Sequence, residues 1–194
     1  MLIDTLVENP WMVALSWVVL SLFDFSATML YSKAYRDFLS SSVVYERGVE
    51  MNPMFEKDVK QLRWFSPRYF ILMPVAAFLI GFAGMWIPAK MFELLAGTAI
   101  LLVLVVDLRH IENLSFVWFL KSDPEGFKGK IEQSYKLSQR RVAVNAFNTG
   151  VLYLIVFLLT GRIFFIGGTI VSVLLAIRHF LLSRRKLSQE SSVN

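Results

Sequence analysis

Residues 91–118 read MFELLAGTAILLVLVVDLRHIENLSFVW, and this stretch decides the fold. Its first part is almost continuously apolar, which is typical of a helix that crosses a bilayer with about 20 residues. Asp107, Arg109, His110 and Glu112 then follow within one and a half helical turns. Ionisable side chains inside a span are costly and usually face the protein interior. The stretch therefore predicts a membrane helix with a functional site near one end.

The composition of the whole chain agrees with a membrane protein. Of its 194 residues, 56% are hydrophobic and 18% are charged, whereas soluble domains carry about 25% charged residues. Cysteine is absent, which excludes disulfides, cysteine nucleophiles and iron–sulfur clusters. A net charge of +5 would suggest nucleic acid in a soluble protein. Here we expect no nucleic acid and instead anionic lipid headgroups as partners.

Five apolar stretches are long enough to span a bilayer. They cover residues 11–32, 69–87, 91–118, 142–160 and 163–182. Pro88 is expected to end the second span, and Gly161-Arg162 to form a tight turn between the last two. The fold class is therefore all-α: a polytopic bundle of five transmembrane helices in a single domain, residues 1–183. Residues 184–194 are expected to form a flexible cytoplasmic tail.

Basic residues set the predicted orientation. Of the 20 lysines and arginines, the connection 33–68 holds seven, the connection 119–141 six and the tail three. Loops rich in Lys and Arg stay in the cytoplasm, which places the N-terminus outside and the C-terminus in the cytoplasm. Small residues repeat every four positions at Gly168, Ser172 and Ala176, and at Ala77 and Gly81. Such faces favour close helix packing within the bundle, or a homodimer.

Polar residues gather at one depth of the predicted bundle. Ser21, Asp24, Thr28 and Tyr31 share one stripe of the first span, and Asp107 and His110 share a face of the third. Arg109 and Glu112 fall on roughly the opposite side of that helix. Because the first and third spans both run inward, Asp24, Asp107 and His110 are expected to meet in the cytoplasmic half.

The fourth and fifth spans are expected to add polar groups to the same chamber. Asn145 and Asn148 lie on one face of the fourth span, in its cytoplasmic half, and Arg178 and His179 end the fifth. Glu50 and Asn52 lie in the first connection, where Gly48 and Asn52-Pro53 favour a turn that would return these side chains to the chamber. The alternative for that segment is an ordinary solvated loop.

Two of these motifs resemble a known family. Asp24-x-x-x-Thr28, followed by Gly48-x-Glu50-x-Asn52-Pro53, is similar to a signature of small prokaryotic integral membrane proteins. The resemblance covers about the first third of the chain and implies a multi-pass protein of the prokaryotic cytoplasmic (inner) membrane. That family carries no settled activity, so the resemblance supplies a motif and no mechanism.

Three functions are compatible with the chamber. In the first, Asp24, Glu50, Asp107 and His110 bind a divalent metal, since carboxylates and imidazole suit zinc, manganese or iron. Asp24, Asp107 and His110 would then be catalytic toward a lipid or amphipathic substrate, with Thr28, Asn52, Asn145 and Asn148 as supporting polar groups. The second is a proton-coupled transporter of a small solute, because intramembrane Asp and His often relay protons. The third is a non-catalytic assembly or scaffold subunit.

Overall fold

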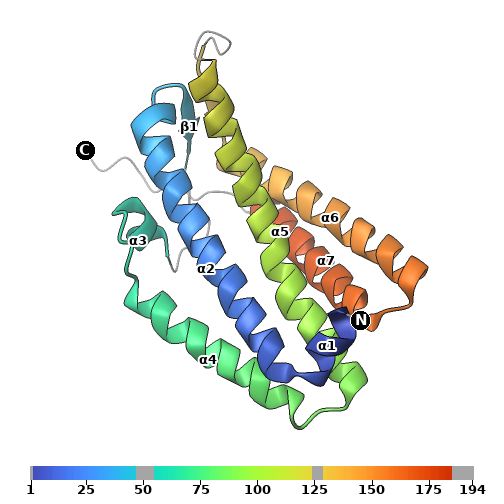
Figure 1. Ribbon diagram of the computed structural model, residues 1–194. Helices are drawn as coiled ribbons and strands as arrows, with labels where there is room; N and C mark the ends of the chain where they lie inside the picture. Colours follow the sequence, from blue (N-terminus) through green and yellow to red (C-terminus); the bar gives the residue numbers. More distant parts are fainter. Residues whose placement is uncertain (1, 47–54, 124–128, 185–194) are drawn as a thin grey trace.

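The computed structural model describes residues 2–46, 55–123 and 129–184. The helices are α1 (Leu2–Glu8), α2 (Pro10–Ala34), α3 (Glu56–Lys60), α4 (Pro67–Gly84), α5 (Ala89–Ser122), α6 (Tyr135–Thr160) and α7 (Ile163–Arg184). A π-helical turn, η1 (Tyr35–Leu39), continues α2, and two short strands are β1 (Val43–Tyr45) and β2 (Ile131–Gln133). Figure 1 shows the long helices as one bundle.

Five of the described helices are long and apolar enough to cross a membrane, as the sequence predicts. They are α2 with η1, α4, α5, α6 and α7. Several observed helix ends differ from the predicted spans. The first span continues through η1 to Leu39, seven residues beyond its predicted end, and α5 continues to Ser122, four residues beyond. α4 ends at Gly84 because the chain already turns at residues 85–88, and α6 begins at Tyr135, seven residues before the predicted start. The predicted flexible tail, apart from Arg184, lies outside the described residues.

Local signals explain where α6 begins and ends. The Ser134 hydroxyl accepts a hydrogen bond from the Leu137 N–H at 3.2 Å and so caps the first turn. At the other end Gly161 adopts φ +67°, a left-handed conformation that glycine takes without strain. Its N–H donates to the Phe157 carbonyl at 2.7 Å. The chain then reverses directly into α7, which confirms the expected turn.

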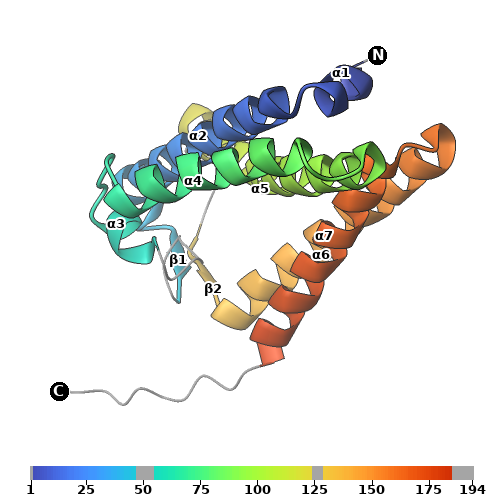
Figure 2. The same ribbon diagram turned by 90° about the horizontal axis from the view of Figure 1, so that it is seen from below.

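The helices form two layers that meet at one end of the bundle. Figure 2 shows α2, α4 and α5 side by side, with α6 and α7 leaning away from them toward the end that carries β1 and β2. Glycines fix the closest approach between α5 and α7. A Cβ on Gly97 would lie 1.8 Å from the Phe164 carbonyl oxygen, and one on Gly167 would lie 2.4 Å from that of Leu94. The main chains of these two helices are therefore in direct contact.

The predicted small-residue faces are buried within this single chain. Ser172 is 0% exposed, and a Cβ on Gly168 would meet Leu101 and Tyr153. A Cβ on Gly81 would meet the Trp11 ring at 2.5 Å. These faces thus pack helices inside the bundle, as expected, while the homodimer stays a prediction.

The two strands were not expected from the sequence. β1 and β2 pair in parallel, with Val43 opposite Ile131, and they link the two connections that separate the spans. The N–H of Tyr135 donates to the Glu46 carboxylate at 2.6 Å, which joins β1 to the start of α6. The strand pair therefore bridges the two layers at the end where they diverge (Figure 2).

Charged residues hold the opposite end of the bundle together. The Arg162 guanidinium lies 2.6 Å from Asp4 of α1 and 3.0 Å from Glu93 of α5. Its hydrogen bond to Asp4 is the main cause that raises the pKa of Arg162. This cluster fastens the α6–α7 turn to α1 and α5.

Candidate functional site

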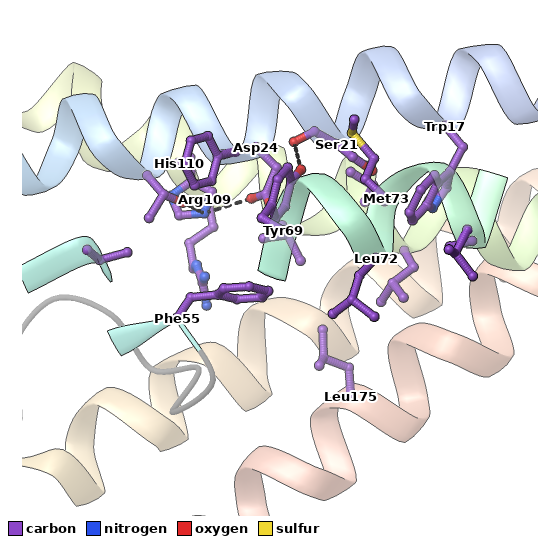
Figure 3. A pocket seen from close by; sticks show the side chains of 18 of the residues that line it. Trp17, Ser21, Asp24, Phe55, Tyr69, Leu72, Met73, Arg109, His110 and Leu175 are labelled. Carbon is purple, nitrogen blue, oxygen red and sulfur yellow. Dashed lines mark hydrogen bonds and ion pairs between the residues drawn. The ribbon is translucent and has the colours of Figure 1, made fainter. Parts of the chain in front are cut away.

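Asp24 and His110 meet between α2 and α5. The Oδ1 of Asp24 lies 3.0 Å from the Nε2 of His110, and the hydroxyl of Thr28 lies 3.1 Å from the same nitrogen. Asp24 and Thr28 are four residues apart on α2, so one face of the helix presents both to His110. Figure 3 shows Asp24 and His110 pointing toward one another across the two helices.

The two contacts to His110 differ in kind. The Thr28 hydroxyl is placed for a hydrogen bond with the His110 Nε2, whereas the Asp24 Oδ1 lies 3.0 Å from the same nitrogen without hydrogen-bond geometry. The His110 side chain is almost fully buried, and its Nδ1 has no hydrogen-bond partner among the described residues. Buried polar atoms are nearly always paired in folded proteins. The buried Nδ1 of His110 is therefore an exception to this pattern among the described residues.

A cavity of about 620 Å³ adjoins this pair. Such a volume falls within the range of about 300–1,000 Å³ that is usual for small-molecule sites. The apolar wall comes from α2, α4, α5 and α7, and Figure 3 shows part of it. Its members include Trp17, Leu72, Met73, Val75, Ala76, Leu79, Leu102, Val103, Val106 and Leu175.

The polar part of the lining lies toward the end of the bundle with the strands. It consists of Ser21, Asp24, Thr28, Tyr69, Arg109, His110, Arg178 and His179. The cavity therefore has a long apolar wall and a charged end, which matches a molecule with an apolar tail and a polar head.

Arg109 lies in this polar part, although its helical position predicts the side opposite His110. The cavity covers a wide arc of α5, from Leu102 through Val106 to His110, and the arginine side chain reaches its edge. The expectation for Arg109 was therefore wrong, because a helical position fixes where a long side chain starts and not where it ends.

Other predicted site residues do not line the cavity. Asp107 is buried at 3% exposure, and both its carboxylate oxygens lack a hydrogen-bond partner among the described residues. It lies close enough to Asp24 and Tyr69, which do line the cavity, to interact with them electrostatically. Asn145 is half-buried and Asn148 is exposed on α6, and neither lines the cavity. Glu50 and Asn52 lie outside the described residues.

The predicted metal site is only partly assembled by the residues that can be placed. Asp24 and His110 supply two ligands in contact. Within residues 2–46, 55–123 and 129–184, no group of three or more His, Cys, Asp or Glu side chains is arranged to hold an ion. The binding of zinc, manganese or iron therefore stays a prediction.

Two polar contacts near the cavity have no counterpart in the sequence interpretation. The Tyr69 hydroxyl donates to the Ser21 carbonyl and so ties α4 to α2, as the dashed line in Figure 3 marks. The buried His179 ring contacts the Gln139 side chain on α6. The Ser134 cap signal, read as a helix start, would have placed Gln139 on α6 instead of in a connection.

Comparison with protein-family models, with curated proteins and with solved structures finds no match.

Proposed function

We propose that the chain is a multi-pass protein of the prokaryotic cytoplasmic membrane, with its N-terminus outside. Five apolar helices support a membrane location. The basic connections join helix ends on the side of the bundle that carries β1 and β2, where Lys and Arg favour the cytoplasm. In this orientation the Asp24–His110 pair lies in the cytoplasmic half of the bilayer.

The function that the cavity supports best is chemistry on a lipid or other amphipathic substrate. One observation carries this proposal: the contact of the half-buried Asp24 and the buried Thr28 with His110 lies at the polar end of an apolar cavity of about 620 Å³. The apolar wall would hold the tail of the substrate, and its polar group would lie beside His110.

The pair has the parts needed for proton transfer. His110 would take a proton from the substrate or return one, since imidazole is the commonest general acid–base group. Asp24 and Thr28 would hold the ring in one orientation, as the carboxylate does in hydrolytic triads.

Mass spectrometry of lipids tests this function directly. Purified protein is reconstituted into vesicles of bacterial total lipid extract, and the lipid composition is followed with time. The expected result is conversion of at least one lipid species by the wild type, and none by Asp24→Asn. Glu112→Gln is the matched control, because it makes the same chemical change at an exposed position of α5.

Three outcomes would overturn the proposal. Identical lipid profiles with and without wild-type protein would exclude lipid chemistry under these conditions. A proton or solute flux that Asp24→Asn abolishes, with unchanged lipids, would establish transport instead. If Asp24→Asn changes only stability, the pair serves the scaffold role.

A further inference from the structure

Two guanidinium groups line the cavity, one from each layer of the bundle. Arg109 belongs to α5 and Arg178 to α7. Among the described lining residues the only carboxylate is that of Asp24, which is in contact with His110. The lining therefore carries more positive than negative formal charge, apart from its histidines.

Arg178 has no ion-pair or hydrogen-bond partner within the described residues. It lies six positions before Arg184, the last residue of α7, whose guanidinium stacks on the Phe180 ring at 4.6 Å. Arg178 is an exposed residue near the end of α7, so an anion can reach its guanidinium. Arg178 is thus available to a ligand in the cavity.

We propose that Arg109 and Arg178 bind the anionic headgroup of the amphiphile. The ligand is then a phospholipid whose phosphate lies at the two arginines and whose acyl chain lies along the apolar wall. This inference depends on the proposed function, since it names the substrate class for the same cavity. The planar guanidinium forks of arginine match the oxygens of a phosphate and can donate two hydrogen bonds at once. A phosphate bound there would also lie beside the Asp24–His110 pair, because all four residues line one cavity.

The apolar wall decides between a lipid phosphate and free phosphate. Leu72, Val75 and Leu79 of α4 line this wall together with Leu102, Val103, Val106 and Leu175. The three α4 residues are 48%, 51% and 59% exposed, so an acyl chain can reach the wall from the bilayer, whereas a free phosphate ion gains nothing from apolar contacts. The structure therefore favours a phosphate that carries an acyl tail.

Trp17 lines the apolar wall and reports on what occupies it. A variant that keeps Trp17 and replaces Trp11, Trp64, Trp86 and Trp118 by Phe is reconstituted into phosphatidylcholine vesicles. Bromine on the acyl chain quenches tryptophan at short range. Brominated phosphatidylglycerol and brominated phosphatidylcholine are then compared at equal mole fractions, and circular dichroism confirms that each variant is folded.

We expect brominated phosphatidylglycerol to quench Trp17 more strongly than brominated phosphatidylcholine. Arg178→Gln should reduce the binding constant for phosphatidylglycerol, relative to that for phosphatidylcholine, by about tenfold, since it removes one charge-assisted contact. Arg178→Lys should retain part of the preference, because it keeps the charge and loses the fork. Arg184→Gln is the matched control on the same helix, outside the cavity lining, and should leave the preference unchanged.

Two results would overturn this inference. If Arg178→Gln and Arg184→Gln reduce the preference for phosphatidylglycerol equally, surface charge alone attracts the lipid. If millimolar glycerol 3-phosphate or inorganic phosphate abolishes the excess quenching, the ligand is a free anion and not a lipid.

The two proposals fail separately. Lipid conversion that requires Asp24, with no effect of Arg178 on the preference, refutes only the headgroup assignment. A preference for phosphatidylglycerol that requires Arg178, without any lipid conversion, supports the headgroup site and refutes the proposed lipid chemistry.

Discussion

Gly97→Ala tests the contact that sets the spacing between α5 and α7. The new Cβ would lie 1.8 Å from the Phe164 carbonyl oxygen and 2.6 Å from its carbon, whereas contacts under 3.0 Å essentially never occur. Because the obstacle is backbone, no side-chain rotation can relieve it. The two helices must separate by about 1 Å or more, and cores resist such a change because they are closely packed.

The magnitude follows from two opposed effects. Overpacking of this kind costs about 1–3 kcal/mol, and a backbone obstacle places the cost toward the upper end. Alanine returns about 1 kcal/mol through its higher helix propensity. We expect the free energy of unfolding to fall by about 1–2 kcal/mol.

Unfolding in mixed micelles with increasing SDS, followed by far-ultraviolet circular dichroism, measures this difference. Gly150→Ala is the control, because its nearest contact would be the Ser172 side chain at 3.2 Å, a distance that small shifts accommodate. Equal or greater stability of Gly97→Ala than of the wild type would refute the close α5–α7 contact.

Three further changes test single contacts. Thr28→Ala should cost about 1 kcal/mol of stability, because it removes the hydroxyl beside His110, while Thr28→Ser should retain most of it; SDS unfolding distinguishes them. Tyr69→Phe keeps the stacking on Phe25 at 4.6 Å but loses the hydrogen bond to Ser21, so a loss of about 1 kcal/mol is expected in the same assay. Arg162→Gln removes both contacts of the half-buried cluster with Asp4 and Glu93. We expect a fall in melting temperature, and high salt should reduce the difference from the wild type only in part, because partly buried ion pairs are less screened.

The sequence predicts the membrane architecture well because hydrophobic length carries that information. Each of the five spans is an apolar stretch that matches bilayer thickness, and each corresponds to one observed helix. The contact between Asp24 and His110 also follows from depth, since both spans run in one direction and place these residues at a similar level. Their chemical role stays a prediction.

The direction in which a polar side chain points around its helix was harder to predict than its depth along the helix. Asn145 and Asn148 have the expected depth on α6, but Ala143, Ala146 and Gly150 are the buried residues of this segment and determine which face packs inward. The polar face is therefore turned from the cavity. Periodicity defines a face of a helix, whereas the small residues decide which neighbour that face meets.

The pairing of β1 with β2 shows another limit. Val43 and Ile131 are brought together by the paths of the spans between them. Their pairing depends on main-chain hydrogen bonds, which leave little pattern in three-residue strands. The same limit applies to Gln139, whose contact with His179 requires α6 to continue beyond its apolar stretch.

Photo-crosslinking with a phosphatidylglycerol that carries a diazirine on its acyl chain shows whether a lipid occupies the cavity. We expect labelled peptides that contain cavity-lining residues such as Met73, Val103 and Leu175, and loss of this labelling when Ala76→Trp fills the cavity. Ile71→Trp, at a position of α4 that is 64% exposed, should leave it intact. Labelling confined to outward-facing residues, unchanged by Ala76→Trp, would contradict a lipid-binding cavity.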